Sequence, residues 1–227
     1  MMSQQISVGL PLQLMRLVSP SQPIGSFAYS RGLEWAVHDK IVCDEETAAA
    51  WIFSFIEHSY AVCDGALFLR MAKALEADDR VAFLDADAWL SAARESRELE
   101  FEDKQMAGSM IQVLCDLGVT RAASFRATRL SYPAAFALAA GHWDISAQDA
   151  LRGLLWSTVE AQVSASIRLV PLGHTAGQRL LIAAAEVIER AARKAETIRD
   201  DEIGNAAPAM AMASAWHETQ YSRLFRS

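Results

Sequence analysis

The sequence lacks the motifs that mark most enzymes and metal-binding proteins. It has neither a P-loop nor a GxGxxG motif, so we expect no nucleotide site of its own, and it has no GxSxG nucleophile elbow. None of its five histidines forms HxH or HExxH or pairs with a cysteine at ligand spacing, and the Glu-x-x-His pairs of helical di-metal sites are missing. We therefore predict no catalysis, no cofactor and no metal site within one chain.

Cysteines, basic clusters and long apolar runs are also scarce. The three cysteines are an odd number without a CxxC pair, which is typical of reduced thiols in the cytosol. The net charge is −7 and no basic patch offsets it, which argues against nucleic-acid binding. Residues 1–9 do not resemble a signal peptide, and no apolar stretch approaches the ~20 residues that span a bilayer. We expect a cytoplasmic protein that binds neither nucleic acid nor a membrane.

The residues that are abundant favour helices. Only six prolines and eleven glycines interrupt a chain in which alanine, leucine, glutamate and arginine recur. Apolar residues repeat at intervals of three and four, and alternation with period two is nowhere sustained. Asp44, Ser131 and Ser146 stand where helix N-caps are expected. The sequence predicts an all-α fold, with residues 1–227 forming a single-domain helical bundle of roughly 8–10 helices.

Two segments near the chain ends have the composition of protein-binding surfaces. Residues 20–35 mix aromatic, small polar and glycine residues, and residues 217–227 interleave aromatic and apolar residues with two arginines. A structural loop-to-helix junction is the alternative for the first segment, and disorder is the alternative for the second. The candidate partner-binding residues are Phe27, Tyr29, Ser30, Glu34, Arg168, Tyr221, Arg223, Leu224, Phe225 and Arg226.

Charged residues elsewhere are predicted to face water. The densest charged run, residues 94–104, has the pattern of a solvated helix face with i,i+4 pairs, and nothing in it indicates carboxylates kept from water. A helix is expected over about residues 26–37. On that helix Leu33 and Val37 face the core, whereas Glu34 is rotated about 100° from Leu33 and reaches the edge or outer face.

Five ordered segments carry a resemblance to a known family. They are SPSQPIGSFAYSRGLEWAV at 19–37, ARESREL at 93–99, LVPLG at 169–173, IGNAAP at 203–208 and HETQYSRLFRS at 217–227. Together they resemble the UreF family of urease accessory proteins over nearly the whole chain. The sequence departs from the family pattern at Arg31, Arg168 and His174, where Gln, Lys and Gln are usual.

The resemblance implies an all-α accessory protein that forms a homodimer and binds a second accessory protein, UreD (also called UreH). Together they recruit the GTPase UreG and deliver nickel to apo-urease, with no catalysis by this subunit. The N-terminal segment (about residues 1–25) and the tail (about residues 217–227) match regions that become ordered against UreD. Glu34 and Arg168 match positions linked to coupling with the GTPase.

Two other functions remain open at the level of sequence. The protein could be a true GTPase-activating protein that supplies an arginine to the partner's nucleotide, with Arg168, Arg223 and Arg226 as candidates. It could also be a helical enzyme whose site is assembled from distant residues. GTP turnover by the partner distinguishes the first from a scaffold, and activity without a partner would indicate the second.

Overall fold

The computed structural model describes residues 12–204 and 207–227, and it is all-helical. Within those ranges 73% of the structure is helical and no strand occurs, as predicted. The elements in chain order are α1 (Leu12–Val18), the 3-10 helix η1 (Ser26–Ala28), α2 (Leu33–His38), α3 (Glu45–Phe55), the π-helical η2 (Ile56–Gly65), α4 (Ala66–Glu76), α5 (Arg80–Ala92), α6 (Arg97–Asp116), α7 (Thr120–Ala123), α8 (Tyr132–His142), α9 (Ala147–Leu169), α10 (His174–Thr197), η3 (Asp200–Glu202) and α11 (Pro208–His217).

Three helices begin at the caps that the sequence predicts. The side chain of Asp44 accepts from the Thr47 amide at 2.9 Å, and Ser146 accepts from the Asp149 amide at 3.1 Å. Ser131 caps α8 through the Ala134 amide. Each cap satisfies an amide that the first turn of a helix leaves without a partner. These boundaries were predictable because the residues that make them are neighbours in the sequence.

The helix predicted over residues 26–37 is instead divided in two. A short 3-10 turn precedes α2, and Gly32 between them has a φ of 77° in the left-handed region. Glycine enters this region without the strain that other residues incur. A Cβ at Gly32 would also lie 2.7 Å from the backbone nitrogen of Ser214 on α11. The break therefore both turns the chain and lets α11 approach α2 closely.

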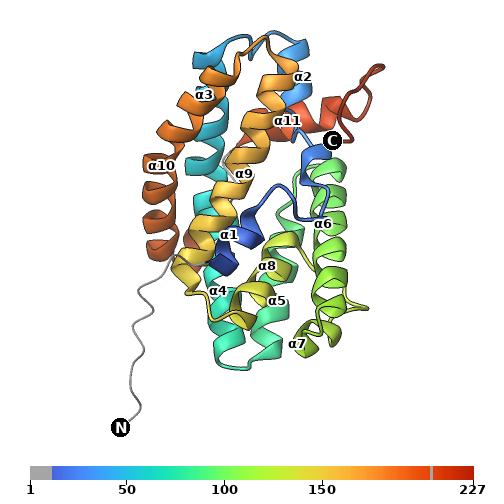
Figure 1. Ribbon diagram of the computed structural model, residues 1–227, viewed down its shortest axis with the longest axis vertical. Coiled ribbons are helices and arrows are strands. Elements are labelled where there is room, and N and C mark those ends of the chain that lie inside the picture. The colour runs from blue at the N-terminus through green and yellow to red at the C-terminus, as the bar shows by residue number, and fades with distance from the viewer. Residues whose placement is uncertain (1–11, 205–206) are drawn as a thin grey trace.

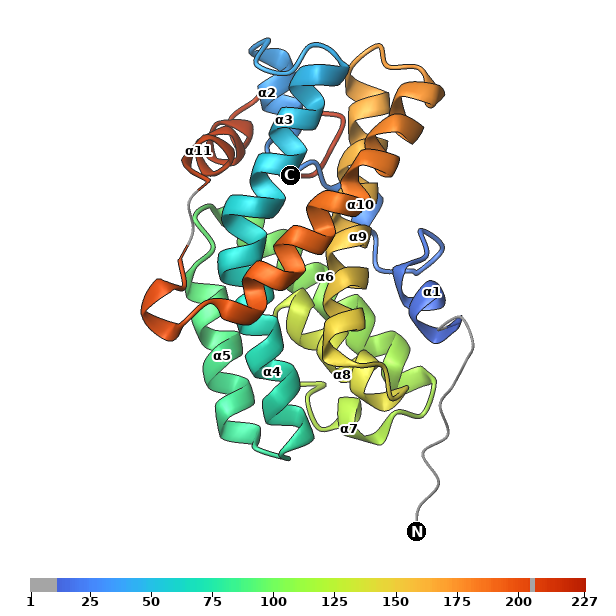
Figure 2. The same cartoon turned by 90° about the vertical axis from the view of Figure 1, so that its left-hand side faces the viewer.

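One continuous helix runs from Glu45 to Glu76 through the middle of the bundle, joining α3, η2 and α4. It packs beside α9 and α10, and Figures 1 and 2 show the three side by side. It is long enough to cross a membrane, and an 18-residue window within it has a mean hydropathy of 1.2, but 67% of that window is buried inside the fold. The expectation that no apolar stretch approaches the length of a membrane span missed this segment, which forms a core helix here.

The remaining helices enclose the core around α8. Residues 132–140 of α8 are all buried, and α8 packs against α4 on one side and α6 on another. The N-terminal helix α1 lies on α9, where Leu14 fills the space left by Gly153. At the upper end of Figure 1, α11 crosses α2, and the residues after α11 return between α2 and α6. This end of the bundle carries the candidate site.

Candidate functional site

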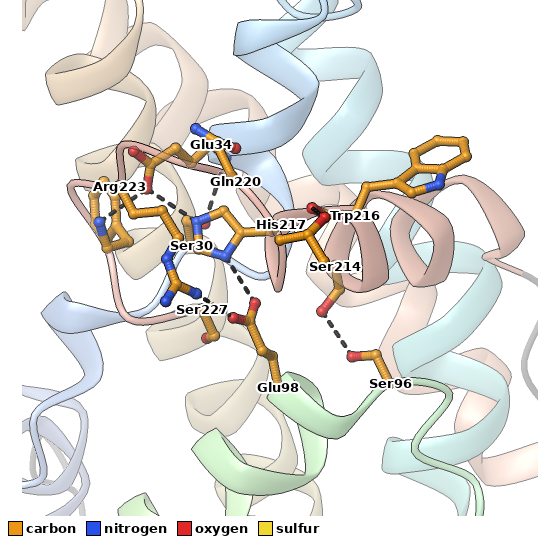
Figure 3. Close-up of polar contacts among 12 residues, drawn as sticks. Ser30, Glu34, Ser96, Glu98, Ser214, Trp216, His217, Gln220, Arg223 and Ser227 are labelled. Carbon is orange, nitrogen blue, oxygen red and sulfur yellow. Dashed lines mark hydrogen bonds and ion pairs between the residues drawn. The ribbon is translucent and has the colours of Figure 1, made fainter.

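A histidine and two glutamates form a buried cluster where α11 meets the bundle. His217, the last residue of α11, is completely buried. Its Nδ1 lies 2.7 Å from Oε2 of Glu98 on α6, and its Nε2 lies 3.2 Å from Oε2 of Glu34 on α2. Figure 3 shows the imidazole between the two carboxylates. The cluster therefore fixes the end of α11 against two helices that are distant in sequence.

Glu34 also holds the residues that follow α11. Its Oε1 accepts a hydrogen bond of 2.6 Å from the Leu224 amide, and its Oε2 accepts one of 2.8 Å from the Phe225 amide. The amide of Glu34 itself donates to the Ser30 hydroxyl at 3.3 Å. A carboxylate that accepts two backbone N–H groups is a strong anchor, because hydrogen bonds to charged groups exceed neutral ones in strength. Glu34 thus fixes the path of the tail.

Further contacts secure the tail on both sides of Glu34. Arg223 donates to Oε1 of Glu98 at 2.7 Å, and the Ser227 hydroxyl donates to Oε2 of Glu102 at 2.8 Å. The amide of Ser30 donates to the Ser227 carbonyl at 2.5 Å, which places residue 227 inside the fold. We call Glu34, Glu98, Glu102 and His217, together with residues 218–227, the tail clamp.

The electrostatics of the clamp favour a charged histidine. Burial disfavours the imidazolium, but hydrogen bonds to Glu98 and Glu34 outweigh burial and raise the pKa of His217 above its ordinary value. At Glu102, burial raises the pKa, while Arg31 and the Ser227 hydroxyl act in the opposite direction. Arg31 donates both to Glu102 and to the Tyr60 hydroxyl. The clamp is therefore a network of buried, mutually compensating charges.

The charged run at residues 94–104 was predicted to face water, and that prediction is wrong for three of its eight charged residues. Glu98, Glu102 and Asp103 are buried. Arg94 bridges Asp64 at 2.8 Å and Asp103 at 3.3 Å, and these carboxylates raise its pKa despite the opposing effect of burial. The prediction failed because charges spaced at i,i+4 occur both on a solvated helix face and on a helix face that the rest of the chain covers.

The position predicted for Glu34 is also wrong. Only 6% of Glu34 is exposed, because the tail covers the side of α2 that would otherwise face water. Phe225 is buried as well, so the tail is neither disordered nor fully projecting. The Arg168 guanidinium stacks over the Phe225 ring at 4.5 Å and donates to the Phe27 carbonyl at 3.3 Å. Arg226 interacts with the Tyr29 hydroxyl.

Three large side chains with apolar surface are more than half exposed around the clamp. Phe27 is 67% exposed, Leu224 is 57% exposed, and Tyr221 is fully exposed. Phe27 lies beside the tail, since the Ala28 carbonyl accepts from the Arg226 amide at 2.8 Å. These side chains therefore face solvent, while hydrogen bonds to the buried residues of the clamp fix the backbone of the tail.

A cavity of about 400 Å³ lies next to the clamp, between the segment after α1 and helix α9. Glu102, Arg31 and Tyr29 form part of its wall on the clamp side, and Phe27 and Arg168 also line it. Tyr132 lines it too, with a buried hydroxyl that has no hydrogen-bond partner of normal geometry and a pKa raised by burial. The cavity is therefore lined both by buried charged residues of the clamp and by the exposed residues Phe27 and Arg168.

Metal ligands are not grouped in the described ranges 12–204 and 207–227. Within them no set of three or more His, Cys, Asp or Glu side chains is arranged to hold an ion. Cys43, Cys63 and Cys115 are free thiols, and burial raises the pKa of Cys63 to about 12. A thiol with such a pKa stays protonated and is a poor metal ligand or nucleophile.

The structure gathers most of the predicted site residues at one place. Five of the ten candidates belong to the tail, four more contact it, and Phe27 lies beside it, while Tyr221 projects into solvent. His217, Glu98 and Glu102 were not among the residues predicted from the sequence. A signal was present, because Glu102 and Asp103 lie three and four residues after Leu99 and so fall on the apolar stripe of α6.

The sequence comparisons identify a class of protein with this fold. Urease accessory protein UreF 2 of Brucella anthropi is 64% identical over 223 residues, covering 97% of this chain and 98% of that protein. The UreF proteins of Alkalilimnicola ehrlichii and Hahella chejuensis are 41% and 38% identical, and each alignment covers at least 95% of both chains. The class is that of the urease accessory proteins.

Within that class the assignment is specific. The UreF family profile matches residues 42–185. The chain belongs to the UreF family. The matched residues run from the loop before α3 into α10, so the tail clamp lies partly outside the profile and within the longer alignments.

Proposed function

We propose that the protein binds a second urease accessory protein, UreD (also called UreH), through the exposed side of the tail clamp. Together they recruit the GTPase UreG and support nickel insertion into apo-urease. In this proposal the protein works as a cytoplasmic homodimer and catalyses no reaction. The docking segments are the tail and the N-terminal segment of residues 1–25, of which residues 1–11 lie outside the described residues.

The observation that carries this proposal is the exposure of Phe27, Tyr221 and Leu224 on an anchored backbone. Large apolar and aromatic side chains are enriched at the centres of protein interfaces. Binding through ordered segments loses less conformational entropy than binding through flexible ones. A tail that is already held by Glu34 and Glu98 therefore presents its apolar side chains at a low entropic cost.

The ten candidate residues have two different roles in this proposal. Three contact the partner directly through apolar surface, and the three arginines surround them as a polar rim. The other four position the tail from inside and act on the partner only through it. These positioning residues are Tyr29, Ser30, Glu34 and Phe225.

The arrangement favours a scaffold over a GTPase-activating arginine. Arg223 is paired with Glu98, Arg168 stacks on Phe225, and Arg226 interacts with Tyr29. An arginine that reaches a partner's nucleotide must first leave such contacts. An enzyme built on His217 is disfavoured too, because both imidazole nitrogens are engaged and the ring is completely buried.

Co-purification with UreD and UreG tests the proposal. Leu224→Asp places a charge in the proposed contact and should abolish UreD binding without lowering the melting temperature, because Leu224 is exposed. Val81→Asp is the matched control, since Val81 is 70% exposed on α5, a helix in the lower half of Figures 1 and 2, away from α11. If Leu224→Asp and Val81→Asp both retain UreD, the tail is not the contact.

GTP turnover by UreG separates the scaffold from the activating arginine. With the partner complex assembled, Arg168→Ala and Arg223→Ala should change the rate of GTP hydrolysis only as far as they change the amount of UreG bound. A large fall in turnover at saturating UreG, with binding intact, would instead identify an arginine that acts on the nucleotide.

A further inference from the structure

The starting observation is that both ring nitrogens of His217 face carboxylate oxygens. Nδ1 lies 2.7 Å from Glu98 and Nε2 lies 3.2 Å from Glu34. A neutral imidazole carries one N–H and one lone pair, so in either tautomer one nitrogen would direct its lone pair at a carboxylate. Only the imidazolium donates to both. The geometry therefore requires either a second proton on the ring or a proton on one glutamate.

With both glutamates ionised, the charges around the ring balance only when the ring is charged. Helices α2 and α6 pack against α11, and they supply Glu34 and Glu98, while the tail supplies Arg223. His217 is the only titratable residue of α11 itself. The neighbouring Glu102 on α6 is paired with Arg31, and Arg97, Glu218 and His38, which lie close to these residues along α6, the tail and α2, are exposed.

Two carboxylates, one guanidinium and one imidazolium sum to zero net charge. Loss of the ring proton leaves one uncompensated negative charge inside the protein. An unpaired buried charge is strongly unfavourable. Because the cluster lies between the tail and the bundle, outward movement of the tail is the simplest way to let water reach that charge.

The same carboxylates hold the tail. Glu34 accepts from the amides of Leu224 and Phe225, and Glu98 accepts from Arg223. A change that drives the two glutamates away from the imidazole therefore also loosens the three anchors of the tail. Proton binding at His217 and docking of the tail are linked through shared atoms.

We propose that His217 is a proton latch: the tail is docked while its imidazole is charged and is released when the ring loses its second proton. His217 is thus a positioning residue for the exposed tail surface, and the part of this inference that concerns UreD rests on the proposed function. We therefore expect binding of UreD to weaken as the pH rises and the imidazole of His217 loses its second proton.

The direction follows from the sign of the linkage. The pKa of His217 is raised in the folded protein because hydrogen bonds to Glu98 and Glu34 outweigh burial. Its contribution to tail docking is complete below the unfolded value of about 6.5 and is lost as the pH rises through the higher folded value. Between these two values the docked state binds one proton more than the released state, so the docking equilibrium falls about tenfold per pH unit, and it levels off above the folded value.

The test follows the tail in the isolated full-length chain between pH 6 and 9. The readouts are the NMR titration of the His217 ring and the hydrogen-exchange protection factors of the Leu224 and Phe225 amides, which are corrected for the intrinsic pH dependence of exchange. We expect protection to fall in step with the ring titration. Protection that stays constant while the ring titrates would overturn the latch.

Two variants sharpen this test. Glu98→Gln replaces one carboxylate by an amide that can donate to a neutral imidazole, so the tail should stay docked at alkaline pH. His38→Gln is the control, because His38 is exposed on α2, and it should keep the wild-type pH dependence. A Glu98→Gln protein with wild-type pH dependence would contradict the latch, and the wild-type titration tests it even if that variant fails to fold.

Binding of UreD to the wild-type chain, measured over the same pH range, separates the two proposals. Parallel loss of tail protection and of UreD binding supports both. If the tail undocks with pH while UreD binding stays constant, the latch stands and the tail is not the contact. If UreD binding depends on Leu224 but the tail stays docked at every pH, the latch is wrong and the proposed function stands.

Discussion

Replacement of Glu34 by alanine removes the central anchor of the tail clamp. The substitution deletes acceptors for the Leu224 amide at 2.6 Å, the Phe225 amide at 2.8 Å and the His217 ring at 3.2 Å. Hydrogen bonds to charged groups contribute about 1.5–3 kcal/mol each, and removal of one partner from a buried ion pair costs about 3–5 kcal/mol. The tail can move into water and regain hydrogen bonds there, which limits the total loss.

We therefore expect Glu34→Ala to lower the free energy of unfolding by about 3 kcal/mol, which corresponds to roughly 10 °C in Tm for a chain of this length. Chemical and thermal denaturation measure this loss. Limited digestion with trypsin reports on the tail, because Arg223 and Arg226 become cleavable once it is released. Glu34→Gln keeps one acceptor oxygen, so its free energy of unfolding should lie between those of the wild type and Glu34→Ala.

Glu186→Ala is the control for this prediction, since Glu186 is an exposed glutamate on α10. It should change stability by less than about 0.5 kcal/mol. A Glu34→Ala protein with wild-type stability and a trypsin-resistant tail would refute the role of Glu34 as an anchor. If Glu34 were exposed, as the sequence alone predicts, its replacement would leave stability and the tail unchanged. The experiment therefore decides between an exposed Glu34 and a buried Glu34 that anchors the tail.

Three further predictions concern packing and buried charge. Deletion of residues 222–227 should lower Tm in the isolated chain, because Phe225 is buried and its anchors are lost; an unchanged Tm would show that the tail packs without stabilising the fold. Gly32→Ala should destabilise the protein by about 1–3 kcal/mol through its left-handed backbone and its close approach to Ser214, as measured by urea denaturation. Arg94→Ala should cost about 3–5 kcal/mol by leaving two buried aspartates unpaired, whereas wild-type stability would mean that water solvates them.

The sequence predicts the helices well because helix signals are local. Asp44 and Ser146 cap helices through residues three positions away, and the stripe of apolar residues on each helix identifies its buried face. The break at Gly32 was missed because its cause is the approach of α11, which lies about 180 residues further along the chain. Local patterns do not carry information about such an approach.

The tail clamp illustrates the same limit for charged residues. His217 meets Glu98 across 119 positions and Glu34 across 183 positions. Composition distinguished the tail and residues 20–35 from the rest of the chain, but it could not show that these two segments contact each other. The family resemblance linked Glu34 to function, and the structure adds a physical reason why that residue matters to the tail.

The last four residues of the tail alternate between side chains that anchor the tail and side chains that face solvent. Leu224 and Arg226 are exposed, whereas Phe225 and Ser227 are buried, so burial alternates along the chain. A substitution at an inward residue must first disturb the clamp, and therefore lowers stability together with partner binding. A substitution at an outward residue leaves the clamp intact, and lowers binding alone. Paired measurements on Phe225→Ala and Leu224→Ala thus separate a tail that contacts the partner from one that only completes the fold: in the second case, Leu224→Ala changes neither quantity.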